Sequence, residues 1–174
     1  MAQSIAEDLA AFLGAEAVEF FPSWETLPFE RVSPAVLTMG SRMRTMWRMH
    51  QGKKAPSVIV AGTRALLQKL APGSTTLEPI HIAVGSTLNI DALCEQLVHC
   101  GYRRETIVEH RGEFARRGAI VDIFPSTDDE PIRVDMWGDD VDRLTHFTVA
   151  DQRSTDDINS IEIFPARELL YVAG

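Results

Sequence analysis

The residues best suited to chemistry lie in one stretch, residues 101–125, where arginines gather among glycines and precede an apolar run. The arginines are Arg103, Arg104, Arg111, Arg116 and Arg117. A guanidinium group is always charged, and its planar fork of N–H donors matches the geometry of a carboxylate or a phosphate. The apolar run 119–124 that follows is typical of a strand. We therefore expect guanidinium groups to be displayed at the head of a rigid sheet.

Two interpretations of this arginine cluster are open on the residues alone. Edge strands often carry charge that prevents aggregation, so the cluster can be a solvated strand edge. Alternatively, it is a binding face for an anionic partner. The formal net charge of −8 makes the cluster a local exception in an acidic protein. That acidity argues against a general nucleic-acid-binding surface, which would be basic over one large face.

Catalytic chemistry finds little support in the sequence. The histidines are scattered, at His50, His81, His99, His110 and His146. His110 lies near Glu109 and Glu113, but no set of nucleophile, base and orienting group can be assigned. Four aspartates are candidates for a metal site, namely Asp122, Asp135, Asp139 and Asp140. Two of them, Asp139 and Asp140, are simply turn residues. No phosphate-binding or dinucleotide-binding glycine motif is present. We therefore expect no enzyme, cofactor or metal, and ATP hydrolysis by the pure protein would contradict this.

The two cysteines and the chain's apolar runs bear on the cellular compartment. Cys94 and Cys100 lie six positions apart on one predicted helix, where they cannot form a disulfide. This favours a reducing, cytoplasmic environment. The first residues have no basic start typical of a signal peptide, and no apolar run approaches the length of a membrane span. We expect a cytoplasmic protein without a membrane partner.

The first part of the chain predicts a partial α/β domain. Helices are expected over 4–13, 34–51 and 63–70, and strands over 18–21 and 57–61. Ser33 is the expected cap of the second helix, whose inner stripe is Val36, Met39, Met43 and Trp47. Its arginines are expected on the outside: Arg42, Arg44 and Arg48. Three exposed arginines could contact DNA weakly, which gives an alternative function, although a solvated helix face is the simpler interpretation.

The pattern changes after a predicted boundary at residues 72–76. An alternating strand over 80–84 precedes a helix over 89–100, with Ile90, Leu93, Leu97 and Val98 inward and Gly101 as its stop. Short alternating strands follow from residue 107, which predicts an antiparallel meander covered by one helix. The strand 161–165 is expected to return to the first, parallel sheet. The predicted fold is thus α+β, with this module inserted into an α/β domain.

Several segments resemble the transcription-repair coupling factor family, Mfd. The matching segments are 21–30 (FPSWETLPFE), 101–103 (GYR), 111–118 (RGEFARRG), 122–125 (DIFP), 134–139 (VDMWGD), 151–154 (DQRS) and 163–166 (IFPA). The first resembles the family's signature loop, and the others resemble the module that Mfd shares with the excision-repair protein UvrB. The resemblance covers nearly the whole chain. It implies a partial RecA-like α/β domain (1–78), a module like domain 2 of UvrB (79–158) and a return strand (159–174).

The resemblance implies UvrA as the partner and recruitment of nucleotide excision repair to stalled transcription as the function. The implied contact residues are Arg103, Arg104, Arg111, Arg117 and Phe124. The resemblance leaves open which of the two neighbours Arg103 and Arg104 makes the contact, and a core role for Phe124 is equally open. Ala115 replaces an arginine of UvrB-like sequences, which favours the Mfd branch.

Other parts of the family's proteins are expected to be absent. These are a RecA-like motor, an RNA-polymerase-binding domain and DNA-contacting parts, so RNA polymerase and DNA would be indirect partners. The chain is expected to start within the first α/β domain, as a fragment or a truncated relative. The resemblance also implies that another domain covers the docking face in the full-length protein. Without that domain, we expect the face to be open to UvrA at all times.

Overall fold

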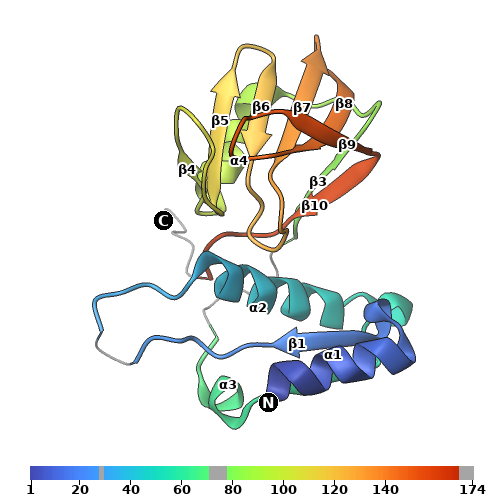
Figure 1. Ribbon diagram of the computed structural model, residues 1–174, viewed down its shortest axis with the longest axis vertical. Helices are drawn as coiled ribbons and strands as arrows, with labels where there is room; N and C mark the ends of the chain where they lie inside the picture. The colour runs from blue at the N-terminus through green and yellow to red at the C-terminus, as the bar shows by residue number, and fades with distance from the viewer. Residues whose placement is uncertain (28–29, 71–77, 169–174) are drawn as a thin grey trace.

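The computed structural model describes residues 1–27, 30–70 and 78–168. It has two parts, the N-terminal lobe (residues 1–70) and the sheet module (residues 78–163), followed by a C-terminal segment (164–168). In Figure 1 the sheet module stands on α2, and β1 and α1 lie below that helix. The predicted boundary at 72–76 and residues 28–29 of the signature loop lie outside the described residues.

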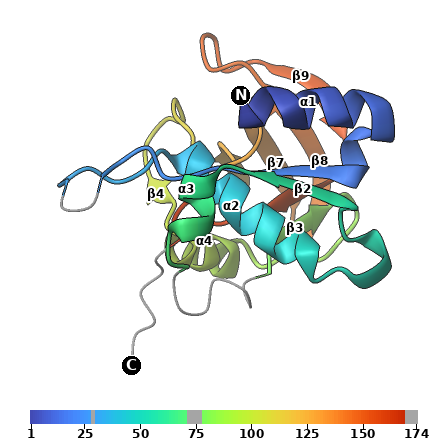
Figure 2. The same ribbon diagram turned by 90° about the horizontal axis from the view of Figure 1, so that it is seen from below.

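The N-terminal lobe is a small parallel sheet between helices. Its elements are α1 (Ala2–Leu13), a 3-10 turn (Ala15–Ala17), β1 (Val18–Phe21), α2 (Val36–Met49), a second 3-10 turn (Gly52–Lys54), β2 (Val58–Ala61) and α3 (Thr63–Leu67). β1 and β2 pair in parallel, with Val18 opposite Val58. α1 packs against both strands and α2 against β1. Seen from below, β2 lies between α1 and α2 (Figure 2).

Most elements of this lobe are confirmed, with shifted ends. Gly14 ends α1 as expected, in the left-handed region with φ of 91°. The cap of α2 was predicted at Ser33, but the helix starts at Val36 after Ala35, without a side-chain cap. α3 stops three residues earlier than predicted, at Leu67. No helix within the three described ranges has the length and apolar character that a membrane span requires.

The sheet module is a six-stranded sheet with one helix on it. Its elements are β3 (Ile80–Ala83), α4 (Ile90–His99), β4 (Arg103–Arg104), β5 (Glu113–Arg117), β6 (Ile120–Ile123), β7 (Ile132–Trp137), β8 (Asp140–Phe147), β9 (Ser154–Ile158) and β10 (Ser160–Ile163). The large sheet has the order β4-β5-β6-β7-β8-β9. β4 is parallel to β5, and the remaining neighbours are antiparallel. The predicted meander with one covering helix is therefore confirmed.

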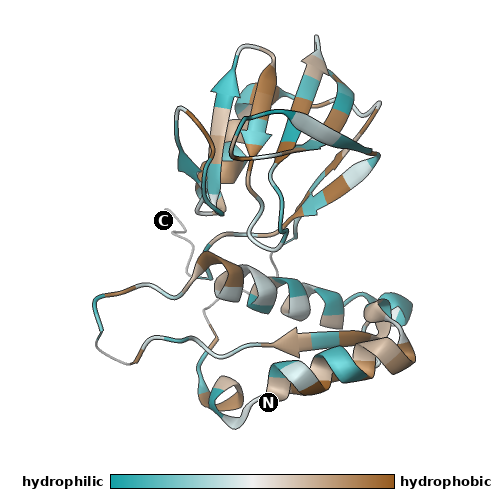
Figure 3. Cartoon of the chain, in the orientation of Figure 1, coloured by the Kyte–Doolittle hydropathy of each residue, from teal (hydrophilic) through white to brown (hydrophobic). Residues whose placement is uncertain are grey.

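Alternation along these strands builds the main core of the module. Phe114, Val121 and Val134 are fully buried, and they form one cluster with Leu93 and Leu97 of α4. Figure 3 shows the corresponding alternation of hydrophobic and hydrophilic residues along the strands. Burying one such side chain fully contributes about 1.5–3 kcal/mol, so this cluster dominates the stability of the module.

α4 begins and ends as the sequence predicted, with one side chain misplaced. The side chain of Asn89 caps it, accepting a hydrogen bond of 2.9 Å from the backbone N–H of Ala92. Gly101 follows the helix in the left-handed region, with φ of 86°. Val98, expected inward, is instead exposed, because it lies one position past the buried Leu97.

The last strand corrects one prediction. The segment 161–165 was expected to join the first, parallel sheet, but β10 pairs antiparallel with β3. Ile161 lies opposite Ile82, and Ile163 lies opposite Ile80. The reason is that these isoleucines pack in the core under α4, so both strands contribute side chains to that core. Residues 159–163 therefore belong to the sheet module.

Close packing joins the module to the N-terminal lobe. Gly40 of α2 lies so close to Ser126 that a Cβ atom at this position would clash with the serine hydroxyl. Ser126 donates from Oγ to the carbonyl of Phe164 at 2.9 Å, and Tyr102 donates from its hydroxyl to the same carbonyl at 2.8 Å. This junction fixes the base of the sheet on α2.

Candidate partner-binding face

The large sheet separates the arginines of the module onto two faces. We call the face that packs on α4 the helix face and the opposite one the outer face. In the pairing of β4 with β5, Arg104 lies opposite Phe114, and Arg103 lies opposite Glu113. Paired residues of adjacent strands share a face, and Phe114 belongs to the core under α4. Arg104 is therefore on the helix face and Arg103 on the outer face, a distinction that the sequence left open.

A second, smaller core covers the end of the outer face nearest the N-terminal lobe. Its buried residues are Val108, Ala115, Phe124 and Phe147. Phe124, a candidate partner contact, is only 8% exposed, so its side chain packs within the protein. The guanidinium of Arg111 lies 5.2 Å from the centre of the Phe124 ring and pairs with Asp129 at 2.6 Å. The environment of both residues is that of structural packing.

Arg103 is held in place by a buried carboxylate. Glu113 Oε2 accepts the backbone N–H groups of Glu109 and His110 at 3.0 and 2.8 Å, and Oε1 accepts from Arg103 Nη2 at 3.0 Å. Burial raises the pKa of Glu113, but these two N–H groups and the charges of His110 and Arg103 together lower it below its usual value. The side chain of Arg103 remains 61% exposed. Its charge is thus positioned and still accessible.

Arg117 shares a buried carboxylate with a second arginine. Asp122 is almost fully buried and accepts a hydrogen bond from Arg117 Nη2. It also accepts from Arg133 Nε and Nη2, at 2.7 and 3.1 Å. The hydrogen bond to Asp122 raises the pKa of Arg133, whose guanidinium lies 4.8 Å from the ring centre of Phe147. The side chain of Arg117 is 46% exposed, so it remains accessible to a partner.

The far end of the outer face carries two residues that the sequence reasoning did not single out. Trp137 ends β7 and is 81% exposed. Arg143, opposite Asp135 on β8, is 53% exposed and pairs with Asp157 of β9 at 2.5 Å. Burial raises the pKa of Asp135, against the charges of Arg133 and Arg143, which lower it. The available signal was the alternation of Arg133, Asp135 and Trp137 with the core residues of the same strand.

The helix face carries the remaining arginines of the cluster. Arg116 forms an ion pair with Asp91 in the first turn of α4. Arg104 is exposed and has no ion pair or side-chain hydrogen bond among residues 1–27, 30–70 and 78–168. Their charges lower the pKa of the Cys94 thiol, but burial outweighs them and the net shift is upward.

Arg42 is a correction, because it lies inside the protein instead of on the outside of α2. It is fully buried and donates from Nε to Glu168 Oε2 at 2.8 Å and from Nη1 to the carbonyl of Pro22 at 2.9 Å. Its guanidinium lies 4.3 Å from the ring centre of Phe21. Trp24 Nε1 donates to the same carboxylate at 2.8 Å. The prediction was wrong because Glu168, distant in sequence, supplies a buried partner.

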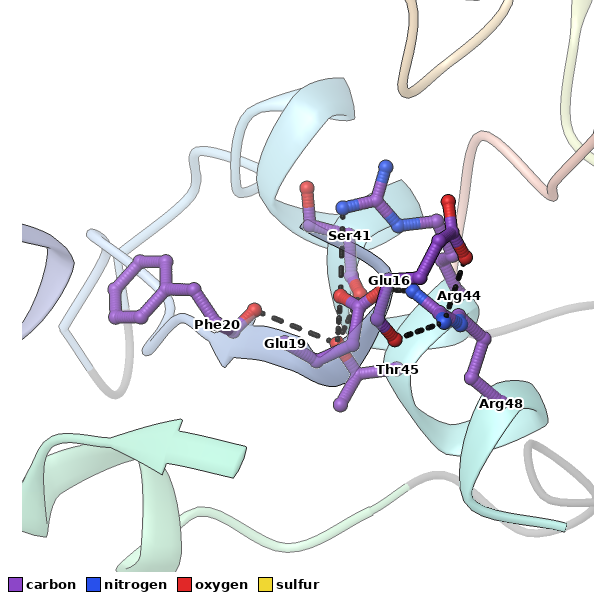
Figure 4. Close-up of polar contacts among 7 residues, drawn as sticks. All are labelled: Glu16, Glu19, Phe20, Ser41, Arg44, Thr45 and Arg48. Carbon is purple, nitrogen blue, oxygen red and sulfur yellow. Dashed lines mark hydrogen bonds and ion pairs between the residues drawn. The ribbon is translucent and has the colours of Figure 1, made fainter. Parts of the chain in front are cut away.

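Arg44 and Arg48 also face carboxylates, as Figure 4 shows. Glu19, buried on β1, accepts from Arg48 Nη1 at 2.7 Å and from Arg44 Nη2 at 3.3 Å. Arg48 Nη2 also pairs with Glu16 at 3.0 Å. The three arginines of α2 therefore do not form one exposed cationic row, and weak DNA binding is not favoured.

Residues 1–27, 30–70 and 78–168 contain no group of three or more His, Cys, Asp or Glu side chains that could hold a metal ion. His110 Nδ1 lies 3.5 Å from Glu113 Oε1. That carboxylate already accepts from Arg103 and, through its other oxygen, from two backbone N–H groups. The arrangement orders a loop and presents no nucleophile.

The chain is similar in sequence to transcription-repair-coupling factors of several bacteria. The relatives include the transcription-repair-coupling factors of Mycobacterium bovis (42% identical over 175 residues, 95% of this chain and 14% of the relative), Haemophilus influenzae (37% over 158 residues, 90% and 14%) and Myxococcus xanthus (31% over 176 residues, 97% and 15%). The chain therefore spans about one-seventh of the length of these relatives. The predicted resemblance to this family is confirmed.

A family model matches the part of the chain that contains the helix face and the outer face of the large sheet. Residues 80–169 match the UvrB interaction domain. The match includes the helix α4 and every strand of the six-stranded sheet. Since it spans more than half of the 174 residues, the chain belongs to the UvrB interaction domain family.

Proposed function

We propose that this chain is the UvrA-binding module of a transcription-repair coupling factor, which recruits nucleotide excision repair to stalled transcription. The observation that carries the proposal is the match of residues 80–169 to the UvrB interaction domain, the part that holds the outer-face arginines. The names of the relatives, which join transcription and repair, support the cellular role. In this role these residues bind a partner and perform no catalysis.

Arg103 and Arg117 are the contacts that the geometry favours. Both lie on the outer face, each bonded to a buried carboxylate, Glu113 or Asp122, and each about half exposed. Side chains that are already ordered lose less conformational entropy when a partner binds. The partner would supply carboxylates to the free sides of these guanidinium groups, in the charge-assisted pairing that arginine makes best.

The other candidates take different roles in this proposal. Arg111 and Phe124 support the second core, and Arg104 lies on the helix face. The N-terminal lobe, with its two parallel strands between α1 and α2, would be part of a RecA-like α/β domain that carries the module. RNA polymerase and DNA would be partners of other parts of the relatives' longer chains.

Charge reversal on the two faces tests this function directly. Arg103→Glu and Arg117→Glu should each weaken the binding of purified UvrA, measured by isothermal titration calorimetry, and the double variant should abolish it. Truncating one partner of a buried charge pair at an interface costs about 2–5 kcal/mol, and reversal costs more. Arg104→Glu is the matched control, because it changes the same charge one residue away on the opposite face. The proposal fails if the double variant binds UvrA as tightly as the unmodified chain does.

A further inference from the structure

Trp137 is the largest side chain that the sheet module leaves in water. It is 81% exposed at the end of β7. The other two tryptophans have partners inside the protein: Trp24 donates to Glu168, and Trp47 meets the edge of Phe164 with ring centres 5.5 Å apart. Tryptophan is among the side chains most enriched at the energetic centres of protein interfaces. The exposed Trp137 is therefore a candidate residue for an interface with a partner protein.

The strand register places Trp137 on the outer face, beside Arg117. Ile120 lies opposite both Arg117 and Asp135, and Trp137 follows Asp135 by two positions, so it shares the same face. The backbone N–H of Met136 donates to the carbonyl of Ala119 at 3.0 Å, which ties the end of β7 to the turn after β5. β5 and β7 point the same way in Figure 1. Strand spacing and residue rise put the two Cα atoms roughly 12 Å apart.

Arg143 borders the same patch from the other side. It lies opposite Asp135 on β8, the strand next to β7. We call Arg117, Trp137 and Arg143 the outer patch. It pairs one large aromatic surface with two guanidinium groups, each held by a carboxylate, Asp122 or Asp157. The second core, which buries Phe124, covers only the opposite end of this face.

We infer that Trp137 is the apolar anchor of the partner-binding face, with Arg117 and Arg143 on its two sides. This inference rests on the proposed function and adds the chemistry of the partner. UvrA would present an apolar pocket for the indole ring, with carboxylates at its rim for the guanidinium groups. A tryptophan buries 150–250 Å² when it docks, with only two side-chain torsions to order. Trp137 thus takes the role that the sequence offered to Phe124.

The test compares the affinity of purified UvrA for four forms of the chain. These are the unmodified chain and the variants Trp137→Ala, Trp137→Phe and Leu67→Ala. Trp137→Ala should weaken binding by about 30-fold or more, the level that defines an interface hot spot. Trp137→Phe should recover most of the affinity, because a ring still fills the pocket. Leu67, 80% exposed on α3, is the matched control, and its removal should change the affinity less than twofold.

A spectroscopic measurement separates anchoring from loss of fold. The chain is produced with 5-hydroxytryptophan, whose fluorescence can be excited apart from the ordinary tryptophans of UvrA. Adding UvrA should shift the 5-hydroxytryptophan emission to shorter wavelength and should reduce its quenching by iodide. The Trp137→Phe variant should show neither change. An unchanged emission at saturating UvrA would overturn the inference.

The outcomes also separate this inference from the proposed function. If Arg117→Glu abolishes binding while Trp137→Ala binds within twofold of the unmodified chain, the anchor is wrong and the UvrA-binding function stands. If the unmodified chain does not bind UvrA, both are wrong. If Trp137→Ala binds weakly and Trp137→Phe binds well, both are supported.

Discussion

Arginines bound to buried carboxylates occur in both parts of the molecule, and they end in opposite environments. In the N-terminal lobe, Arg42 is enclosed by Glu168, the carbonyl of Pro22 and the ring of Phe21. In the sheet module, Arg117 binds Asp122 through Nη2, and its side chain remains about half exposed. The carboxylate is buried in both cases. What differs is the cover: a loop and the C-terminal segment close over Arg42, whereas the sheet leaves its outer face open beside Arg117.

This difference separates a buried structural ion pair, which we call the Arg42 clasp (Arg42 and Glu168), from an arginine that is accessible to a partner protein. Removing one partner of a fully buried ion pair leaves an uncompensated charge and costs about 3–5 kcal/mol. A solvent-exposed pair contributes at most about 1 kcal/mol. Arginine substitutions in the N-terminal lobe should therefore act on stability, and those on the outer face should act on binding.

The largest effect is expected at Arg42. Arg42→Ala leaves the Glu168 carboxylate buried without its cation, so the free energy of unfolding should fall by about 3–5 kcal/mol. Urea unfolding followed by circular dichroism measures this. The double variant Arg42→Met/Glu168→Leu removes both charges and should regain much of the stability. A single variant as stable as the unmodified chain would show that the clasp contributes little.

A smaller effect on stability, joined to an effect on binding, is expected at Asp122. Asp122→Ala removes the carboxylate that orders Arg117 and leaves Arg133 without its main partner. Stability should fall by about 1.5–3 kcal/mol, the typical contribution of a hydrogen bond to a charged group. UvrA should bind more weakly, because Arg117 loses its position. In a double-mutant cycle, Asp122→Ala should weaken binding much less in the Arg117→Ala background; equal losses in both backgrounds would contradict a positioning role.

Local sequence patterns predicted the secondary structure of this chain better than the environments of its arginines. The meander and α4 follow from alternation and capping, which are local patterns, so they were predicted well. The environment of Arg42 depends on Glu168, which is 126 positions away, and no local pattern reveals such a partner. The faces of Arg103 and Arg104 depend on the register of β4 against β5, since adjacent residues in a strand point to opposite faces.

The same limit explains why the sequence left the role of Phe124 open. Phe124 follows β6 and Trp137 ends β7, and local sequence does not show which of the two rings other segments cover. Val108 and Phe147 come from two separate segments and meet over Phe124. That tertiary contact leaves Trp137 as the exposed aromatic residue of the outer face.

A pH-dependent effect is expected at Glu113, which holds Arg103. The pKa of Glu113 is lowered in the folded state, so its contribution to stability is complete above the unfolded pKa, near 4.5, and is lost as the pH falls through the lower folded value. Glu113→Gln should therefore lower the thermal midpoint at neutral pH. The gap to the unmodified chain should narrow as the pH falls below about 4.5. The exposed neighbour variant Glu109→Gln is the control, and a gap that stays constant with pH would contradict the assignment.

The smallest effect is expected at the exposed end of the outer face, where Asp157 pairs with Arg143. Both side chains are more than half exposed, so water and salt screen the attraction. Asp157→Asn should leave the thermal midpoint almost unchanged, and any difference should vanish at high salt. Arg143 keeps its charge in this variant but loses its ordering partner, so the affinity for UvrA should fall only slightly. A large loss of stability would mean that this exposed pair contributes as much as the buried pair of Arg42 and Glu168. Burial of the ion pair would then not be what distinguishes the two regions.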